Sequence, residues 1–471
     1  MSQVKIIPVI LSGGAGSRLW PMSRDQQPKQ FLPLLEGESM FHRTLERVRD
    51  GNTFLPPMVV TGQAFRHLVE KELAVLGLGG HLVLEPQRRD SAAAIAVACA
   101  LAVEQDSNAL LYVMAADHLV SDIDAFVATA RDGMEAALEG WIVTFGITPD
   151  KPATGFGYIE PGEVVCGTIK QVARFLEKPI ESLARELIVK GCLWNSGNFL
   201  FRADVMIEEL QRFAPDIAAR SLEAVNKRKK IHTGTVTVDI LDAAAFAACP
   251  ATSIDFAVLE HSQRVAVIPA QYGWSDLGSW EALWSVMPRD AEGNALSGAT
   301  TVMGTHNSLV SSTGPHVVVL DLENVAVIAT ADAVLVAPRQ VANVLKPVVA
   351  HLQRSPATIL LTVQHQSTSF VWGQEEILIS TKNHILRRIE IAVGFEYEAK
   401  VPEGMLCHVL VVSGGADTGS IADDAILLAG RHLTWTGPFR GKIRNSHTQV
   451  LVLMETLLNL SPVQIRLSKY G

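Results

Sequence analysis

A chain of 471 residues is longer than a single hydrophobic core usually supports, so we expect two or three domains. Hydrophobic residues make up 48% of it and charged residues 19%, a balance that argues against intrinsic disorder. The net charge of −9 argues against a nucleic-acid or anionic-membrane surface, so any phosphate chemistry is expected in a local basic pocket.

The five cysteines are scattered without CxxC or Cys/His spacing, which predicts neither a disulfide framework nor a structural zinc site. The first apolar run, Lys5 to Leu11, is short and leads into a glycine turn rather than a cleavage site. No later apolar stretch reaches about 18 residues, the length that a membrane helix needs. We therefore expect a cytoplasmic protein.

The first half of the chain alternates short β-branched runs with longer helical stretches. This alternation is typical of an α/β domain built on a mostly parallel sheet. The expected strands are Lys5–Leu11, Pro57–Thr61, Leu110–Ala115 and Trp141–Ile147. The expected buried helices are Ala92–Gln105 and Ala125–Leu138.

From about Gly293 the pattern changes to short β segments rich in Gly, Ser and Thr. They are Ser308–Ser312, His316–Leu320, Val325–Thr330 and Ala333–Ala337. Ala350 to Ser369 is interpreted as a connector, after which the β pattern resumes. We predict an α/β domain over residues 1–290, a β-rich, β-helix-like domain over 291–350 and a C-terminal β domain over 351–471.

A glycine-rich loop follows the first strand. Its glycines allow the main chain to approach a ligand closely, so that backbone N–H groups can bind phosphate oxygens. The loop has no GK[ST], and Leu19 occupies the third glycine position of the dinucleotide fingerprint. Arg18 and Lys29 add two cations, which offset the repulsion between phosphates. A bare glycine turn is more often structural, but these cations favour a phosphate site.

The segment Ser12–Leu34 resembles the signature of the mannose-1-phosphate guanylyltransferases of the long bacterial type. The resemblance continues in chain order over roughly the first 290 residues, the size of one domain. Its further motifs are Glu85–Arg89, Ala116–His118, Thr144–Ile147, Thr154–Ile159, Phe175–Pro179, Trp194–Phe199, Ser253–Ala257 and Trp274–Trp280.

The resemblance implies a Rossmann-like nucleotidyltransferase domain, followed by a β-rich domain and a cupin-like one. It implies that GTP and mannose 1-phosphate react with the help of Mg²⁺, which suits two carboxylates and phosphate oxygens. The implied catalytic residues are Arg18, Lys29 and Lys178. The implied nucleotide-binding residues are Ser12, Gly13, Gly14, Gly16, Glu85, Arg89 and Asp117. The implied sugar-binding residues are Gly157, Glu177, Lys178 and Asn195, and the implied metal ligands are Asp117 and Asp276.

Two features depart from the family pattern. Relatives usually carry asparagine where this chain has Asp90, so an amide donor gives way to a charge and the choice of nucleotide stays open. In many relatives the third domain is a cupin with mannose-6-phosphate isomerase activity. Here the stretch Pro402–His408 keeps only His408 of the expected metal ligands, whereas catalytic zinc sites commonly use three. We predict that the isomerase activity is absent.

Two alternatives stay open. The first is a nucleotidyltransferase for another sugar 1-phosphate or another nucleotide, because motifs do not report pocket shape. The second is a catalytically silent nucleotide-sugar sensor, which the presence of Arg18, Lys29 and Asp276 argues against. The sequence predicts no nucleic-acid or membrane partner and is compatible with a homo-oligomer.

Overall fold

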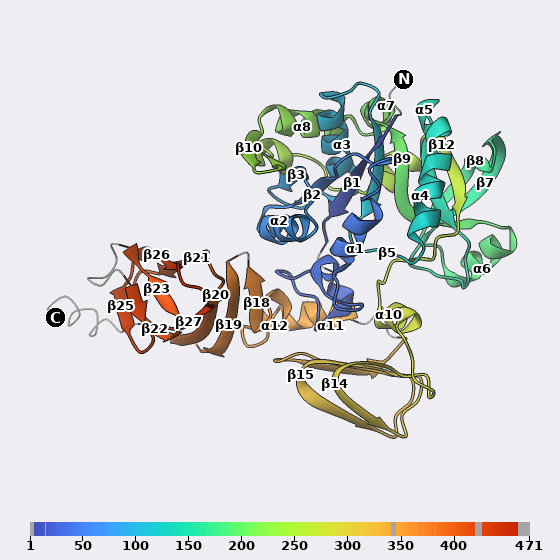
Figure 1. Ribbon diagram of the computed structural model, residues 1–471. Coiled ribbons are helices and arrows are strands. Elements are labelled where there is room, and N and C mark those ends of the chain that lie inside the picture. The colour runs from blue at the N-terminus through green and yellow to red at the C-terminus, as the bar shows by residue number, and fades with distance from the viewer. Residues whose placement is uncertain are drawn as a thin grey trace. The chain divides into compact units, whose positions relative to one another are not determined.

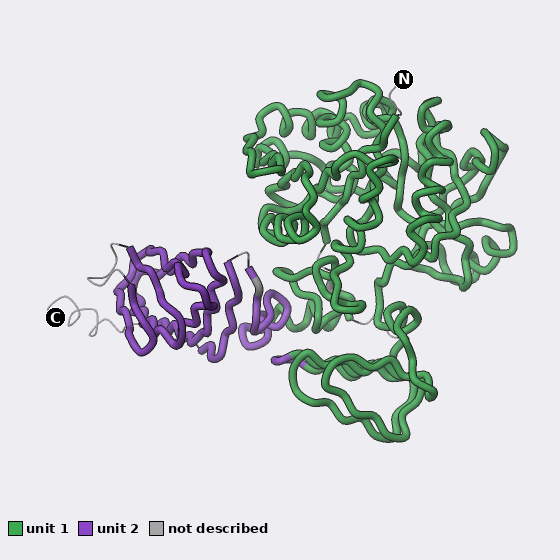
Figure 2. The backbone as a smooth tube through the Cα atoms, in the orientation of Figure 1, with its two compact units in different colours: residues 1–330, 334–354 green, residues 331–333, 355–471 purple. Residues whose placement is uncertain are grey.

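The computed structural model describes residues 4–14, 16–340, 345–370, 372–381, 383–419 and 426–459. The chain divides into two compact units (Figure 2). The first comprises residues 1–330 and 334–354, and the second comprises residues 331–333 and 355–471. The first unit holds a large sheet covered by helices and a smaller β-rich segment, whereas the second is built mainly of antiparallel strands (Figure 1).

The central sheet of the first unit has 11 strands and buries both faces. Along β1, Ile6 and Ile10 enter one apolar core while Ile7 and Val9 enter the core on the other face. Alternate side chains of a strand point to opposite faces, so a strand that is apolar throughout requires cover on both sides. In spatial order the strands are β10 (Lys229–Thr233), β11 (Val236–Ile240), β3 (Gly80–Glu85), β2 (Met58–Gly62), β1 (Ile6–Ser12), β4 (Leu110–Ala115), β9 (Leu193–Arg202), β6 (Ile142–Ile147), β12 (Val265–Ala270), β8 (Ile169–Glu177) and β7 (Gly157–Cys166).

The run from β11 to β4 is parallel, as is the pair β6–β12, while β9, β8, β7 and β10 add antiparallel pairs. The part of the sheet that carries the glycine loop is therefore parallel, as expected. The four strands expected from the sequence agree with β1, β2, β4 and β6 to within one residue.

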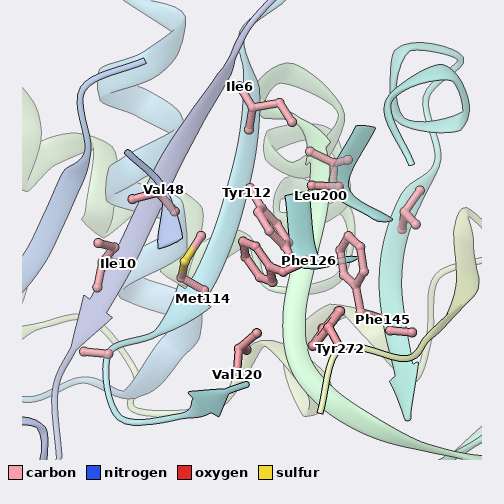
Figure 3. Close-up of a cluster of buried hydrophobic side chains, with 14 of the residues drawn as sticks. Ile6, Ile10, Val48, Tyr112, Met114, Val120, Phe126, Phe145, Leu200 and Tyr272 are labelled. Carbon is pink, nitrogen blue, oxygen red and sulfur yellow. The ribbon is translucent and has the colours of Figure 1, made fainter. Parts of the chain in front are cut away.

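Helices cover both faces of this sheet (Figure 1). Figure 3 shows part of one core, where the ring of Tyr112 lies 5.3 Å from that of Phe126 and 4.8 Å from that of Phe145. The helix expected over Ala125–Leu138 is wrong as a single element, because Gly133 separates two helices there. The helices are α1 (Met40–Arg47), α2 (Arg66–Val75), α3 (Asp90–Val103), α4 (Ile123–Asp132), α5 (Met134–Leu138), α6 (Glu181–Val189), α7 (Ala203–Phe213), α8 (Pro215–Asn226), α9 (Ala243–Ala247) and α10 (Trp280–Val286).

Several short elements lie in the connections between these helices and strands. They are the 3₁₀ helices η1 (Ser17–Leu19), η2 (Lys29–Phe31) and η3 (Gln63–Phe65), the π-helix η4 (Asp255–Leu259) and the paired strands β5 (Leu119–Val120) and β13 (Trp274–Ser275).

The β-rich segment stacks parallel strands without helices between them. Its strands are β14 (Ala295–Met303), β15 (Leu309–Leu320), β16 (Val325–Ala329) and β17 (Val334–Pro338), of which only β17 runs antiparallel to its neighbour. The two strands expected over Ser308–Ser312 and His316–Leu320 form the single strand β15. The helix α11 (Leu345–Leu352) follows.

The second unit contains two antiparallel sheets. The first comprises β18 (Ser367–Phe370), β19 (Gly373–Ser380), β20 (His384–Ile391), β27 (Leu451–Asn459), β22 (Met405–Ser413) and β25 (His432–Thr436). The second comprises β21 (Glu396–Val401), β26 (Phe439–Asn445), β23 (Gly415–Asp417) and β24 (Ile426–Leu428). The expected connector Ala350–Ser369 is not a plain linker, because it includes the end of α11, the short helix α12 (Leu360–Val363) and most of β18.

All five cysteines are free, and four of them are buried while Cys166 is half-buried. Among the described helices, none has both the length and the apolar character needed to cross a membrane.

Candidate active site

A cavity of about 610 Å³ lies where three strands of the central sheet end. Leu11 of β1, Glu85 of β3 and Ala115 of β4 line it from their carboxyl ends. Open α/β sheets bind ligands at this edge, since the loops that follow parallel strands meet there. Of the residues predicted to bind nucleotide, five line the cavity: Gly13, Gly14, Glu85, Arg89 and Asp117.

The glycine loop takes a backbone conformation that favours glycine, with φ of +91° at Gly14 and +60° at Gly16. A Cβ on Gly16 would lie 2.5 Å from the Cβ of Lys29, so the loop packs directly on η2. At Gly13 and Gly14, by contrast, a Cβ would meet nothing within 4 Å. The loop is thus packed against Lys29 at Gly16 and has free space at Gly13 and Gly14, where it lines the cavity.

Lys29 joins this loop to the two predicted metal ligands. Its side chain is 4% exposed, its ammonium lies 2.9 Å from Asp117 Oδ2, and it also donates a hydrogen bond to the main-chain oxygen of Asp276. Burial by itself raises the pKa of Asp117, but the Lys29 ammonium and His118 outweigh it and hold that pKa below its ordinary value. Asp117 is therefore ionised at neutral pH.

Asp276 reaches the same place through a short antiparallel pairing. Ser275 of β13 pairs with Leu119 of β5, which brings Asp276 beside the segment that carries Asp117. Asp276 Oδ1 accepts a hydrogen bond of 3.1 Å from the Gly278 N–H. A Cβ on Gly278 would collide with Asp276 Oδ2 and lie 3.2 Å from Arg18 Nη1, so this glycine leaves room for both side chains.

The donor set of this cluster suits a divalent cation. Two carboxylates are hard ligands, and Mg²⁺ commonly takes one or two of them with phosphate oxygens and water. No group of three or more His, Cys, Asp and Glu side chains that could hold a metal ion occurs in the described part of the chain. The predicted pair Asp117 and Asp276 stays a prediction, to which the structure adds that both residues contact Lys29.

The predicted sugar-binding residues gather on β7, β8 and β9. Asn195 donates to Asp255 Oδ1 at 2.9 Å and accepts from the Thr144 hydroxyl at 3.0 Å. Glu177 pairs with Lys178, whose φ is +46°. Asp255, which accepts the hydrogen bond from Asn195, also lines the cavity, so the predicted sugar-binding residues lie next to it.

Gly157 faces Glu177 across the β7–β8 pair. A Cβ on Gly157 would lie 2.5 Å from Glu177 Oε2, so a larger residue there would displace the Glu177 carboxylate from its present position. Burial, and then the charge of Glu177, raise the pKa of Asp255 to about 6. Asp255 lies in the motif Ser253–Ala257, whose resemblance to the family places it near the site but implies no chemical step for it.

Glu85 is the most buried carboxyl group on the cavity wall. Its residue is 7% exposed, and its Oε1 has no hydrogen-bond partner among the described residues. Burial raises its pKa to about 7. Arg89 nearby donates to the main-chain oxygen of Ala247. Asp90 begins α3 with φ of +63° and lines the cavity.

Two further residues support the Asp117 turn: Arg47, which lies in none of the sequence motifs, and Trp274, which begins the motif Trp274–Trp280. Arg47 of α1 is buried and donates a hydrogen bond of 2.6 Å to the His118 carbonyl, and burial lowers its pKa to about 10. Trp274 Nε1 donates to His118 Nδ1 at 3.2 Å. Arg47 lies in an ordinary amphipathic helix, so only the folded chain reveals this contact.

A family model described as Nucleotidyl transferase matches residues 7–293, which hold the central sheet and the cavity. Fold, site and this match define the chain as a sugar-1-phosphate nucleotidyltransferase. A curated protein of Sinorhizobium fredii named mannose-1-phosphate guanylyltransferase is 39% identical over 395 residues, covering 83% of this chain and 76% of the relative. The chain therefore belongs to the mannose-1-phosphate guanylyltransferase family. Nucleotidyltransferases of this family generally use a divalent metal.

Two solved structures are similar to the chain. One from Thermus thermophilus, described as a mannose-1-phosphate geranyltransferase, is 31% identical with a TM-score of 0.65 and covers 74% of this chain and 100% of its own. A mannose-6-phosphate isomerase from Helicobacter pylori is 28% identical with a TM-score of 0.50 and covers 58% of this chain and 100% of its own. The expected fold class is thus confirmed: a Rossmann-like nucleotidyltransferase domain, a β-rich part and a cupin-like β domain.

We predict that Gly157→Ala weakens use of the sugar 1-phosphate. The new methyl group displaces the Glu177 carboxylate, so the KM for the sugar 1-phosphate should rise about 10- to 100-fold while that for the nucleotide stays within about twofold. Gly155→Ala is the matched control, because a Cβ there meets nothing within 4 Å. Steady-state kinetics that give the two variants equal KM values would show that Glu177 is not in the sugar site.

Proposed function

We propose that this chain transfers the GMP group of GTP to mannose 1-phosphate, which gives GDP-mannose and pyrophosphate. The observation that carries the proposal is the buried Lys29, which links the glycine loop to Asp117 and Asp276. A cation between a phosphate loop and a carboxylate pair suits the transfer of a nucleotidyl group. The family relatives are named for this reaction.

The reaction is a direct displacement. An oxygen of the mannose 1-phosphate attacks the α-phosphorus of GTP, the new P–O bond forms, and the bond to the bridging oxygen of pyrophosphate breaks. Arg18 stabilises the triphosphate, and Lys29 stabilises the charge that develops during transfer. Lys178 stabilises the attacking phosphate. These cations serve by position and charge, so no covalent intermediate on the protein is needed.

We propose Mg²⁺ as the divalent metal, held by Asp117 and Asp276. When bound, it neutralises phosphate charge and helps to align the triphosphate. Lys29 keeps the Asp117 carboxylate ionised and in place, and Gly278 N–H orients the Asp276 carboxylate.

In this proposal the triphosphate is bound by Ser12, Gly13, Gly14 and Gly16. The nucleoside is bound by Glu85 and Arg89. Glu85 selects guanine. Its unpartnered oxygen is an acceptor on a buried wall, and such an atom is costly unless a ligand supplies donors. The guanine edge presents N1–H and an amino group to a carboxylate, whereas adenine presents an acceptor at N1.

The sugar lies against Gly157, Glu177, Lys178 and Asn195, with Asp255 between it and the nucleotide. Asn195 is oriented by hydrogen bonds from Thr144 and Gly197 and can present only part of its amide to a hydroxyl. We place the reaction in the cytoplasm, because GTP is its substrate and the five free cysteines fit a reducing compartment.

The first test is product formation. Purified protein with Mg²⁺, mannose 1-phosphate and GTP should release pyrophosphate and form GDP-mannose, identified by mass. Asp276→Ala should lower the rate at least about 100-fold, because it removes one of the two carboxylates. ATP, UTP, CTP and dTTP, and other sugar 1-phosphates, are run in parallel. A faster reaction with any of them would replace the substrate proposed here, and binding without turnover would favour a nucleotide-sugar sensor.

The second test is the pH dependence of GTP use. Glu85 has to be ionised to accept two donors, and its pKa is raised to about 7, so kcat/KM for GTP should rise between pH 6 and 8. Glu85→Gln should lower kcat/KM for GTP about 10- to 100-fold and flatten this rise. Saturating Mg²⁺ keeps the titration of GTP itself constant. A variant that keeps the wild-type profile would remove Glu85 from guanine recognition.

We propose that the second unit lacks mannose-6-phosphate isomerase activity. His408 of β22 is exposed and bonded to the Thr434 hydroxyl at 2.7 Å. Deeper in the unit, Glu455 is buried and accepts from Arg387 Nε at 2.7 Å and from the Tyr397 hydroxyl at 2.8 Å. Salt-bridged side chains of this kind are unsuited to hold a metal in place of the missing histidines.

The isomerase prediction is tested with the full chain. Mannose 6-phosphate incubated with the protein and Zn²⁺, Co²⁺ or Mn²⁺ should give no fructose 6-phosphate above the rate of a metal-only blank. Formation of fructose 6-phosphate that disappears with His408→Ala would overturn the prediction.

A further inference from the structure

One apolar cluster of the first unit lies directly behind the catalytic residues. We call it the junction cluster. From the catalytic side it contains Leu19, Leu119 and Leu277, and from the β-rich segment it contains Leu309 and Ile328. Leu19 follows Arg18 in the chain, Leu119 is two residues after Asp117, and Leu277 follows Asp276. Each of these proposed site residues thus has its anchor in the same core.

Leu277 is the unusual member of the cluster. Its φ is +42°, in the left-handed region that a branched side chain rarely adopts. Such a conformation persists only where the surrounding structure holds it. Leu277 is 0% exposed, so its burial in the junction cluster helps to hold the turn, together with the hydrogen bond of 3.2 Å that its N–H donates to the Ser275 hydroxyl.

The left-handed turn fixes both the main-chain oxygen and the side-chain carboxylate of Asp276. Its main-chain oxygen accepts from Lys29, and its carboxylate accepts from the N–H of Gly278, on the far side of Leu277. If Leu277 relaxed to an ordinary φ, the peptide groups on either side of it would rotate. Both hydrogen bonds of Asp276 would then be lost together.

The β-rich segment completes the core that holds Leu277. Leu309 of β15 and Ile328 of β16 are both 0% exposed and lie in the junction cluster. A hydrogen bond of 3.3 Å from Arg24 to the Thr330 hydroxyl joins the same parts of the chain. Removing these side chains would leave a cavity in the same core that buries Leu277.

We propose that the β-rich segment is a positioning platform for the active site: the core that it completes with Leu309 and Ile328 holds Leu277, and Leu277 holds Asp276 where it would serve as a metal ligand. Leu277 is a positioning residue, because it acts only through its neighbour. The inference rests on the proposed nucleotidyl transfer for its chemistry, but its geometry concerns Asp276 alone.

The test compares two adjacent buried residues of β15. Leu309 lies in the junction cluster, whereas Val310, also 0% exposed, lies in a separate core of the β-rich segment with Val319 and Val327. Leu309→Ala and Leu277→Ala should weaken the binding of Mn²⁺ to the complex of the protein with GTP. This binding is measured by electron paramagnetic resonance in the absence of sugar phosphate. We expect a loss of about 10- to 100-fold, as for other residues that orient a metal ligand.

The same variants should lower kcat and raise the Mg²⁺ concentration needed for half-maximal rate, with the KM for mannose 1-phosphate within about twofold of wild type. Val310→Ala should lower the melting temperature without changing any of these quantities. Leu277→Met, which keeps the buried volume, should restore Mn²⁺ binding. If Leu309→Ala does not fold, Ile328→Val removes a single methylene from the same cluster and should give the same effect in smaller degree.

The Mn²⁺-binding measurements can contradict the proposed platform in two ways. Equal Mn²⁺ binding by Leu309→Ala, Val310→Ala and wild type would overturn the platform, as would unchanged binding in Leu277→Ala. If the wild-type protein binds Mn²⁺ with GTP as described but forms no GDP-mannose, the proposed reaction fails while the positioning of Asp276 stands.

Discussion

The active-site end of the molecule depends on one buried cation. The ammonium of Lys29 would be costly to bury alone, and the Asp117 carboxylate and the Asp276 carbonyl are what make its position stable. The contact of Gly16 with the Lys29 stem places the glycine loop at the same point. Lys29 therefore links the glycine loop, Asp117 and Asp276, and a change of this one side chain would alter all three contacts together.

Much of this arrangement can be predicted from the sequence, for physical reasons. Strands β1, β2, β4 and β6 are short, mostly apolar and bounded by turns, so their limits are local properties of the chain. Asp117 comes two residues after β4, and parallel strands bring their carboxyl ends to one edge. Glu85 is the last residue of β3, a strand that was not among the four expected, and it was selected through its motif alone. The order of the motifs then identifies the family.

What could not be predicted depends on contacts between distant segments. The antiparallel strands β7, β8 and β9 have mixed burial patterns, and their side chains give no clear period. The role of Arg47 arises from a carbonyl 71 residues away in the chain. The left-handed turn at Leu277 could not be predicted either, since leucine is a poor choice for this conformation and its burial in the surrounding core is a contact between distant segments.

The state of the cysteines has a practical consequence. Burial raises the pKa of the thiol in all five, including the half-buried Cys166, so at neutral pH they are almost entirely protonated. Only the thiolate reacts quickly with alkylating reagents. A cysteine introduced at an exposed position would therefore be modified first. Fluorescent or spin labels can be attached at chosen places without removing the native thiols.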